Sequence, residues 1–249
     1  MLQQTQTSRV VGPWERFLRR FPTPTSCADA SLADVLRLWE GLGYHRRAKA
    51  LHAAAKTIRD RFNGEVPSSV PDLLELPGVG DYTAHAVASF AFDQHVAVLD
   101  TNVGRVLARA IANRTLHRAE AKTMAHELLP RSDAAAFNQS MLDLGAGFCT
   151  SSPRCVECPV ARHCRWRRDG GADPAPTSAG VSRPQSVFVG SNRQLRGKVL
   201  ASLRHSSRTE RQLATLLDGV DRGRFDEVLE SLLADGLIER KRSSFRLAQ

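Results

Sequence analysis

Residues 72–92, DLLELPGVGDYTAHAVASFAF, contain the turn that decides how this chain folds. An apolar helix end leads into the tight turn 76–80, Leu-Pro-Gly-Val-Gly, and a second helix of small residues is predicted to begin near Asp81. Glycine adopts positive φ without steric strain and lets another molecule approach the bare backbone amides. The first amides of the second helix lack intrahelical acceptors and carry the positive end of the helix dipole. This pattern predicts a helix–hairpin–helix motif with a phosphate-binding turn.

Such a motif holds DNA through its phosphate backbone and does not read the base sequence. A Gly-x-Gly turn alone would be weak evidence, because any tight connection between two helices can contain one. The complete Leu-Pro-Gly-Val-Gly turn, followed at once by a helix of small residues, is more specific. The residues predicted to contact DNA at this turn are Leu76, Gly78, Val79 and Gly80.

The next segment, 97–109, places an acidic residue at the start of another helix. Its sequence, AVLDTNVGRVLAR, is a short apolar run that delivers Asp100 to a helix with an apolar face. At that position Asp100 suits an ordinary helix N-cap. Beside a DNA-binding hairpin, the same carboxylate is also placed to stabilise positive charge on a sugar. Asn102 is predicted to fix the orientation of this loop.

Four of the five cysteines lie in 149–164, CTSSPRCVECPVARHC, with the spacing C-x5-C-x2-C-x5-C. This spacing is tight enough for one inorganic centre, and both iron–sulfur clusters and structural zinc accept four cysteine ligands. Disulfides are disfavoured, because nothing in the chain indicates secretion. The fifth cysteine, Cys27, is predicted to be an ordinary core residue. The predicted ligands are Cys149, Cys155, Cys158 and Cys164.

The composition is that of a basic globular protein. The 249 residues are 42% hydrophobic, and 35 Lys and Arg against 26 Asp and Glu give a formal charge of +9. We expect a soluble cytoplasmic protein, because the chain shows neither a signal-peptide-like start nor a run long enough to span a bilayer. The charge favours a polyanionic partner, nucleic acid before an anionic membrane surface. Around Cys164 and Trp166 the chain carries Arg162, Arg165, Arg167 and Arg168.

Residues 1–168 show consecutive amphipathic helices, which predicts a compact all-α bundle. Ser31 suits the N-cap of one of these helices, and Asn63-Gly64 suits the end of another. Residues 169–192 are rich in Gly, Pro, Ala and Ser, and are predicted to form a linker.

Residues 193–249 are predicted to form three helices and a short basic hairpin that turns at Ser243-Ser244. This is the order of a winged helix-turn-helix, which is a common nucleic-acid module. Two roles remain open for this unit, contact with DNA or packing as a small protein-interaction appendage.

In this order, the hairpin, the aspartate loop and the four-cysteine loop resemble the helix–hairpin–helix DNA glycosylase superfamily. Five blocks of sequence narrow the resemblance to the MutY family of A/G-mismatch adenine DNA glycosylases. It covers about residues 1–168 and implies a two-lobed helical domain. The blocks are MLQQTQ at 1–6, LWEGLGYHRRAKAL at 38–51, LPGVGDYTAHAV at 76–87, VLDTNVGRVLAR at 98–109 and FNQSMLDLGAGFCT at 137–150.

The resemblance implies a cofactor, a partner and a mechanism. The four cysteines would bind a [4Fe–4S] cluster, and the partner would be double-stranded DNA with a mismatch or an oxidised guanine, bound by a monomer. Gln3, Gln4 and Tyr44 match positions that wedge into the base stack near the lesion. The target adenine would be flipped into a pocket, and Asp100 would stabilise the oxocarbenium-like sugar.

The resemblance also implies a reaction type. Endonuclease III, a related enzyme, has a nucleophilic lysine just after the hairpin, where this chain has Tyr82. A phenol cannot form a Schiff base, so a purely hydrolytic, monofunctional glycosylase is implied. Tyr82 would otherwise be a core aromatic residue, whereas the resemblance places it in the lesion pocket.

The chain departs from the family pattern at both ends. The family's general-acid Glu would lie two positions before Met1, so the chain as written is expected to be an impaired enzyme. Either the natural protein starts upstream, or this is a shortened form that binds without efficient cutting. The residues after Asp169 are too few for the Nudix-like domain that recognises 8-oxoguanine in many family members. Two other functions stay open: a G·T-mismatch thymine glycosylase, and a non-catalytic iron–sulfur DNA-binding protein.

Overall fold

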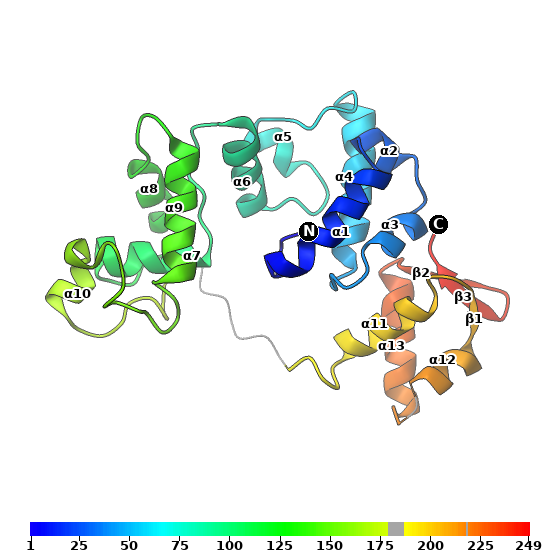
Figure 1. The fold of residues 1–249 in the computed structure, drawn as a ribbon. Coiled ribbons are helices and arrows are strands. Elements are labelled where there is room, and N and C mark those ends of the chain that lie inside the picture. The colour runs from blue at the N-terminus through cyan, green and yellow to red at the C-terminus, as the bar shows by residue number, and fades with distance from the viewer. Residues whose placement is uncertain (179–186, 218) are drawn as a thin grey trace. The chain divides into compact units, whose positions relative to one another are not determined.

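The structure is a computed structural model that describes residues 1–178, 187–217 and 219–249. Helices account for most of these residues, and the strands form one small sheet near the C-terminus (Figure 1). The mainly helical fold predicted from the sequence is confirmed. In the described part of the chain, no helix has both the length and the apolar character needed to cross a membrane. The chain divides into unit 1, Met1–Pro67, Leu76–Gly78 and Gln185–Gln249, and unit 2, Ser68–Glu75 and Val79–Pro184.

The N-terminal helices of unit 1 begin and end where local chemistry predicts. Ser31 caps its helix, because its Oγ accepts a hydrogen bond of 3.2 Å from the amide of Asp34. Asn63 and Gly64 both have positive φ after another helix, and the Gly64 amide donates to the Ile58 carbonyl. Both predicted helix ends are thereby confirmed. The helices are α1(Thr7–Arg20), α2(Pro24–Ala28), α3(Leu32–Leu38) and α4(Arg46–Arg61).

The C-terminal part of unit 1 contains the three predicted helices and the predicted hairpin. The hairpin turns one residue earlier than expected, at Arg242-Ser243, because Lys241 pairs with Ser244 and Arg242 adopts positive φ. A two-residue strand, too short to show an alternating pattern, pairs with the last strand. The sheet order is β1-β3-β2, all antiparallel. The elements are α11(Asn192–Ser202), β1(Arg208–Thr209), α12(Glu210–Leu216), α13(Arg222–Ala234), β2(Ile238–Lys241) and β3(Ser244–Leu247).

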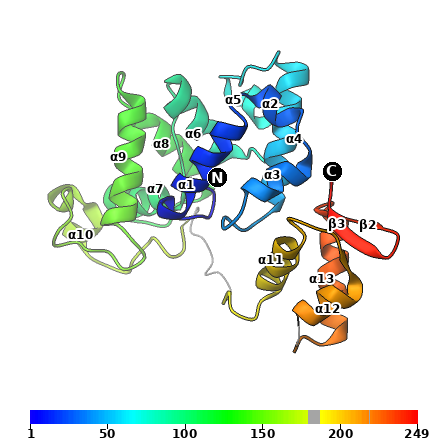
Figure 2. The same cartoon turned by 45° about the vertical axis from the view of Figure 1, so that its right-hand side comes forward.

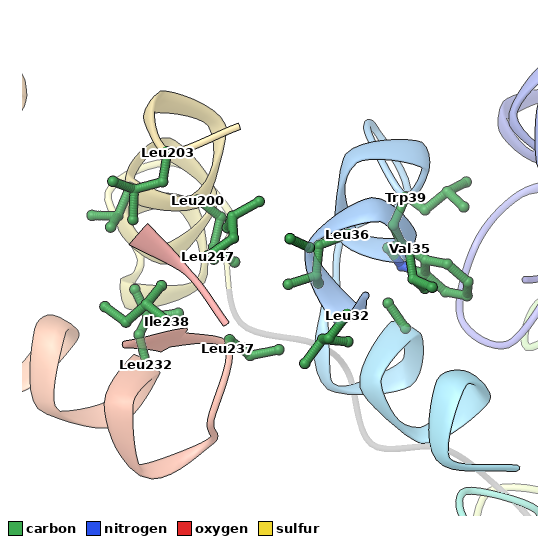
Figure 3. Packing of buried hydrophobic residues seen from close by; sticks show 14 of the residues in the cluster. Leu32, Val35, Leu36, Trp39, Leu200, Leu203, Leu232, Leu237, Ile238 and Leu247 are labelled. Atoms are coloured by element: carbon green, nitrogen blue, oxygen red, sulfur yellow. The ribbon is translucent and has the colours of Figure 1, made fainter. Parts of the chain in front are cut away.

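One hydrophobic core joins these C-terminal elements to α3. Figure 3 shows Leu32 and Leu36 of α3 on the side that faces the apolar side chains of α11, α13, β2 and β3, and Val35 on the opposite side with Trp39. Ion pairs accompany this core, with Arg46 Nε 2.7 Å from Asp235 Oδ2 and Arg204 in contact with Glu40. The core residues labelled in Figure 3 are Leu32, Val35, Leu36, Trp39, Leu200, Leu203, Leu232, Leu237, Ile238 and Leu247.

Unit 2 holds the two helices of the hairpin, the aspartate loop and the cysteine loop, whereas the turn residues Leu76–Gly78 belong to unit 1. The buried amide of Asn138 fastens the segment before Asp100, because its Oδ1 accepts from the Val98 amide at 3.1 Å and its Nδ2 donates to the Val96 carbonyl at 2.8 Å. Figure 2 shows these helices from a second direction. The elements are α5(Val70–Leu74), α6(Asp81–Phe92), α7(Thr101–Val106), the π-helical η1(Leu107–Ala112), α8(Arg118–Glu127), α9(Ala134–Gly147), η2(Ala161–His163) and α10(Arg165–Asp169).

The first part of the predicted linker, 169–192, makes packing and polar contacts that the sequence did not predict. Ala175 is buried, and the Ser178 hydroxyl accepts a hydrogen bond of 3.1 Å from the Leu116 amide. Asp173 pairs with a buried arginine, so polar contacts order residues that lack apolar content. Positions 179–186 of this linker lie outside the described residues. The domain boundaries expected after 168 and before 193 stay predictions.

Leu36→Ala should lower the free energy of unfolding by about 2–5 kcal/mol, because it leaves a cavity in the core that joins α3 to the C-terminal elements. Leu36 is 3% exposed, whereas Leu216, the matched control for Leu216→Ala, is 43% exposed. Urea unfolding followed by circular dichroism measures both variants. Equal losses in the two would show that this core does not stabilise the protein.

Candidate functional site

The hairpin turn is built so that its backbone is accessible. Gly78 has φ +78°, and a Cβ there would lie 2.5 Å from the Cβ of Ala50, so a larger residue does not fit. Gly78 and Gly80 are exposed, and Gly80 is the N-cap of α6 without a side chain to cover the first amides. Val79 is half-buried and Leu76 is buried. The exposed amides at this turn therefore suit an anion, while Leu76 supports the turn from inside.

Asp100 is both the N-cap of α7 and a wall of a cavity. Its Oδ1 accepts from the amides of Asn102 and Val103, each at 2.8 Å, so the capping role weighed from the sequence is present. Its Oδ2 accepts from Asn102 Nδ2 at 2.7 Å, a contact that fits the predicted role of Asn102 in this loop. These hydrogen bonds hold the carboxylate in one orientation.

Tyr82 lies beside this carboxylate. Tyr82, Asp100 and Arg118 line a cavity of about 280 Å³ together with Leu99 and Thr101. Burial raises the pKa of Tyr82 above its ordinary value, and the Asp100 carboxylate raises it further. A phenol that stays neutral near a carboxylate can donate or accept a hydrogen bond in this cavity.

Arg105 was not predicted, yet it connects the aspartate loop to the cysteine loop. Its Nη2 donates to Asn102 Oδ1 at 2.6 Å and to the Gly145 carbonyl at 3.0 Å, and its Nε donates to the Cys149 carbonyl at 2.9 Å. Gly145 has to be glycine, because a Cβ there would lie 2.6 Å from the Asn102 Cβ. In the sequence, the one signal is that Arg105 and Arg109 are one helical turn apart.

The four predicted metal ligands line one cavity, whose other walls include Val106, Leu144, Phe148 and Trp166. All four thiols are free of disulfides. Burial raises the pKa of Cys149, the hydrogen bond from Arg109 lowers it, and Cys158 and Cys164 raise it. In the described residues, no three His, Cys, Asp or Glu side chains are spaced to hold a single metal ion. The four thiols thus line one common space.

Arg109 is a second residue that the sequence reasoning missed. It is 1% exposed, and its Nη1 donates to the Thr150 carbonyl at 2.6 Å and lies 3.4 Å from Cys149 Sγ. Its Nε and Nη2 reach the Asp173 carboxylate at 2.8 and 2.6 Å. Burial opposes its charge, but the hydrogen bonds to Asp173 and Cys149 outweigh burial and raise its pKa.

The predicted wedge residues lie in unit 1, and Arg47 joins two of them, Gln3 and Tyr44. Gln4 and Tyr44 both have positive φ, +55° and +47°, a strained state for residues other than glycine. Arg47 Nη1 donates to the Met1 carbonyl at 3.1 Å and to the Gln3 carbonyl, and the Arg47 guanidinium lies 5.3 Å from the Tyr44 ring centre. The structure therefore brings Gln3 and Tyr44 to one arginine, and no contact of Gln4 with that arginine is seen among the described residues.

The chain is similar to proteins of known function. Residues 1–131 match the HhH-GPD superfamily of base excision DNA repair proteins. This chain belongs to that superfamily. It is therefore a base excision repair DNA glycosylase, an enzyme that hydrolyses N-glycosidic bonds, as the sequence predicted. The family match ends before the cysteine loop, so the loop is judged from its own geometry.

Three relatives and two solved structures are similar to this chain. Adenine DNA glycosylases of Mycobacterium tuberculosis (strain ATCC 25618 / H37Rv) and Mycolicibacterium smegmatis are 45% and 44% identical, over 96% of this chain and 80% and 82% of theirs. Adenine DNA glycosylase of Homo sapiens is 39% identical over 68% of this chain and 32% of its own.

A thermostable thymine-DNA glycosylase matches in fold, with TM-score 0.62 and 24% identity over 68% of this chain and 80% of that chain. A trapped endonuclease III–DNA covalent intermediate matches over the same shares, with TM-score 0.59 and 26% identity. Both likenesses agree with the helical fold, and the second is to a protein in complex with DNA.

Asp173→Asn should lower the free energy of unfolding by about 2 kcal/mol at pH 7, because Arg109 stays buried without its carboxylate. The hydrogen bond from Arg109 lowers the pKa of Asp173. A carboxyl whose pKa is lowered in the folded state stabilises the protein above its unfolded pKa of about 3.9, and this contribution is lost as the pH falls further.

The difference between the wild type and Asp173→Asn should therefore be largest at pH 7 and shrink below about pH 4, as measured by urea unfolding across pH. Asp169→Asn, which breaks an exposed pair with Arg168, is the matched control and should not change stability measurably. A pH-independent difference would contradict the assignment.

Proposed function

We propose that this chain removes adenine paired with 8-oxoguanine or guanine in duplex DNA, acting as a monomer. The proposal rests on one observation, the Asp100 carboxylate held in fixed orientation beside Tyr82 in a cavity of unit 2. The adenine DNA glycosylases that are 45% and 44% identical over 96% of the chain support adenine as the target.

Binding begins at the hairpin. The exposed amides around Gly78 and Gly80 hold a backbone phosphate, aided by the N-terminus of α6. The target nucleotide then leaves the base stack, at a cost of a few kcal/mol. Gln3, Gln4 and Tyr44 enter the space left in the stack. Lys and Arg displace counterions from the phosphates, so affinity falls steeply with salt.

Cleavage then takes place at the sugar. The bond between the sugar carbon and the adenine nitrogen breaks, and its electron pair leaves with the base. The sugar gains positive charge, which the negative Asp100 stabilises because hydrogen bonds from Asn102 and Val103 keep its carboxylate aimed. Water adds to the sugar carbon, its proton ends on the departed adenine, and an abasic site remains. Tyr82 cannot form an imine, so the reaction stops at hydrolysis.

The cysteine loop is proposed to hold a [4Fe–4S] cluster through Cys149, Cys155, Cys158 and Cys164. When bound, the cluster supplies a structural brace that holds the basic loop, and no electron transfer is assigned to it. Arg109 and Arg105 donate hydrogen bonds to Cys149, and Arg105 also bonds Asn102, so the brace reaches the aspartate loop.

Asp100→Asn should lower the single-turnover rate of adenine release about 100-fold or more, because asparagine lacks the negative charge that stabilises the sugar cation. Asparagine also caps helices well, so the fold and DNA binding should be kept. Asp93→Asn, at the exposed left-handed end of α6, is the matched control. Retention of the full rate by Asp100→Asn would exclude this mechanism.

Duplexes with A·8-oxoguanine, A·G and T·G measured in the same assay separate the alternatives. Excision from T·G alone would indicate a thymine glycosylase, since a thymine-DNA glycosylase shares this fold. Binding without release of any base would indicate a non-catalytic DNA-binding protein.

The purified protein should be brown and contain about four iron and four sulfide per chain, because the four thiolates hold a cubic cluster. Iron and sulfide analysis with visible absorbance measures this. Cys155→Ser and Cys158→Ser should lose iron and absorbance, whereas Cys27→Ser should keep both, since Cys27 is buried in unit 1. A colourless protein with one zinc would contradict the cluster.

A further inference from the structure

The C-terminal part of unit 1 reaches a predicted wedge residue through one arginine. Arg193, in the first turn of α11, donates a hydrogen bond of 2.6 Å from Nη1 to the Tyr44 hydroxyl. Its guanidinium also lies 5.5 Å from the centre of the Tyr44 ring. Both residues belong to unit 1. The side chain of Tyr44 is thus held by a residue 149 positions away in the sequence.

This contact is part of a stack of alternating rings and guanidinium groups. The Arg193 guanidinium also lies 5.4 Å from the centre of the Phe188 ring. The Arg47 guanidinium lies 5.3 Å from the centre of the Tyr44 ring and 5.6 Å from that of the Trp39 ring. Trp39 is 1% exposed, whereas Phe188 is 53% exposed. The stack therefore runs from the core to the surface, with Tyr44 in its middle.

A stack of this kind restricts the ring that it encloses. A planar guanidinium fits against aromatic faces and directs its N–H groups at fixed angles, which a lysine cannot do. The backbone of Tyr44 has φ +47°, a sparsely populated conformation for a residue other than glycine that surrounding contacts have to hold. Arg193 and Arg47 fix the position of the ring from two sides.

The charge of α13 argues against a different role for the C-terminal elements. In a winged helix-turn-helix, the third helix would enter the major groove. In α13 the exposed positions include Glu227 and Glu230, whose charges would be repelled by phosphates. Its N-terminal Arg222 pairs with Glu210 and Asp226. Contact with the wedge is therefore better supported than insertion of α13 into a groove.

We propose that Arg193 is a positioning residue that holds Tyr44 in the conformation that enters the base stack. The C-terminal elements thereby take part in recognising the mismatch, through the purine opposite the target adenine. This inference rests on the wedge role of Tyr44 in the proposed function. Arg193 acts through the Tyr44 ring and hydroxyl, without itself binding a phosphate.

A double-mutant cycle tests this inference in the full chain carrying Asp100→Asn, so that binding is measured without cleavage. Discrimination is the ratio of affinities for A·8-oxoguanine and A·T duplexes, measured by fluorescence anisotropy. Arg193→Ala and Tyr44→Ala should each lower discrimination about fivefold to tenfold, and the double variant should lose no more than Tyr44→Ala. Arg193→Lys should lose most of the discrimination, because lysine lacks the planar fork.

Two controls separate positioning from other roles. Arg222→Ala removes an exposed arginine of α13 that pairs with Glu210 and Asp226, and should keep discrimination. Salt dependence should have the same slope with and without Arg193, whereas a lost phosphate contact would reduce the slope by about one. Thermal unfolding checks that each variant is folded.

The outcomes are distinct. Additive losses in the double variant, full discrimination by Arg193→Lys, or a reduced salt slope would overturn the inference. An effect of Tyr44→Ala without any effect of Arg193→Ala would overturn the inference alone. Normal discrimination by Tyr44→Ala would remove the wedge role from the proposed function, and the inference with it.

Discussion

Hydrogen bonds to the Asp100 carboxylate are the constraint on which the rest of the candidate site depends. Two backbone amides and the Asn102 side chain hold its oxygens, and Arg105 holds Asn102 in turn. The same arginine donates to the Cys149 carbonyl, so the cysteine loop and the carboxylate share one network. Because each member is held by another, the position of the carboxylate is set by unit 2 as a whole and not by the cap alone.

Arginine side chains donate many of the hydrogen bonds that hold the loops of this molecule. Arg47, Arg105 and Arg109 each donate to backbone carbonyls that no helix or strand satisfies. A guanidinium has five donors in a rigid plane, so one side chain can tie several loop segments together. The basic residues therefore stabilise the fold as well as attracting DNA.

Features governed by neighbouring residues were predicted correctly. The cap at Ser31, the helix end at Asn63-Gly64 and the start of α6 at Asp81 depend on a few adjacent residues. The hairpin turn was misplaced by one residue, because Ser243 and Ser244 both suit a turn and only the pairing of Lys241 with Ser244 separates them. The ordering of 173–178 was missed, because its cause is the charge of Arg109 elsewhere in the chain.

Local sequence was enough to predict the helical class, the tight glycine turn before α6, the helix cap at Asp100 and the group of four thiols, because each depends on neighbouring residues. Tertiary structure was needed to learn that Arg105 reaches Cys149, that Arg109 reaches Asp173 and that Arg193 reaches Tyr44. These partners are separated by 44, 64 and 149 positions. In a chain with 35 Lys and Arg, an arginine has many possible partners, and only packing brings one of them within hydrogen-bonding distance.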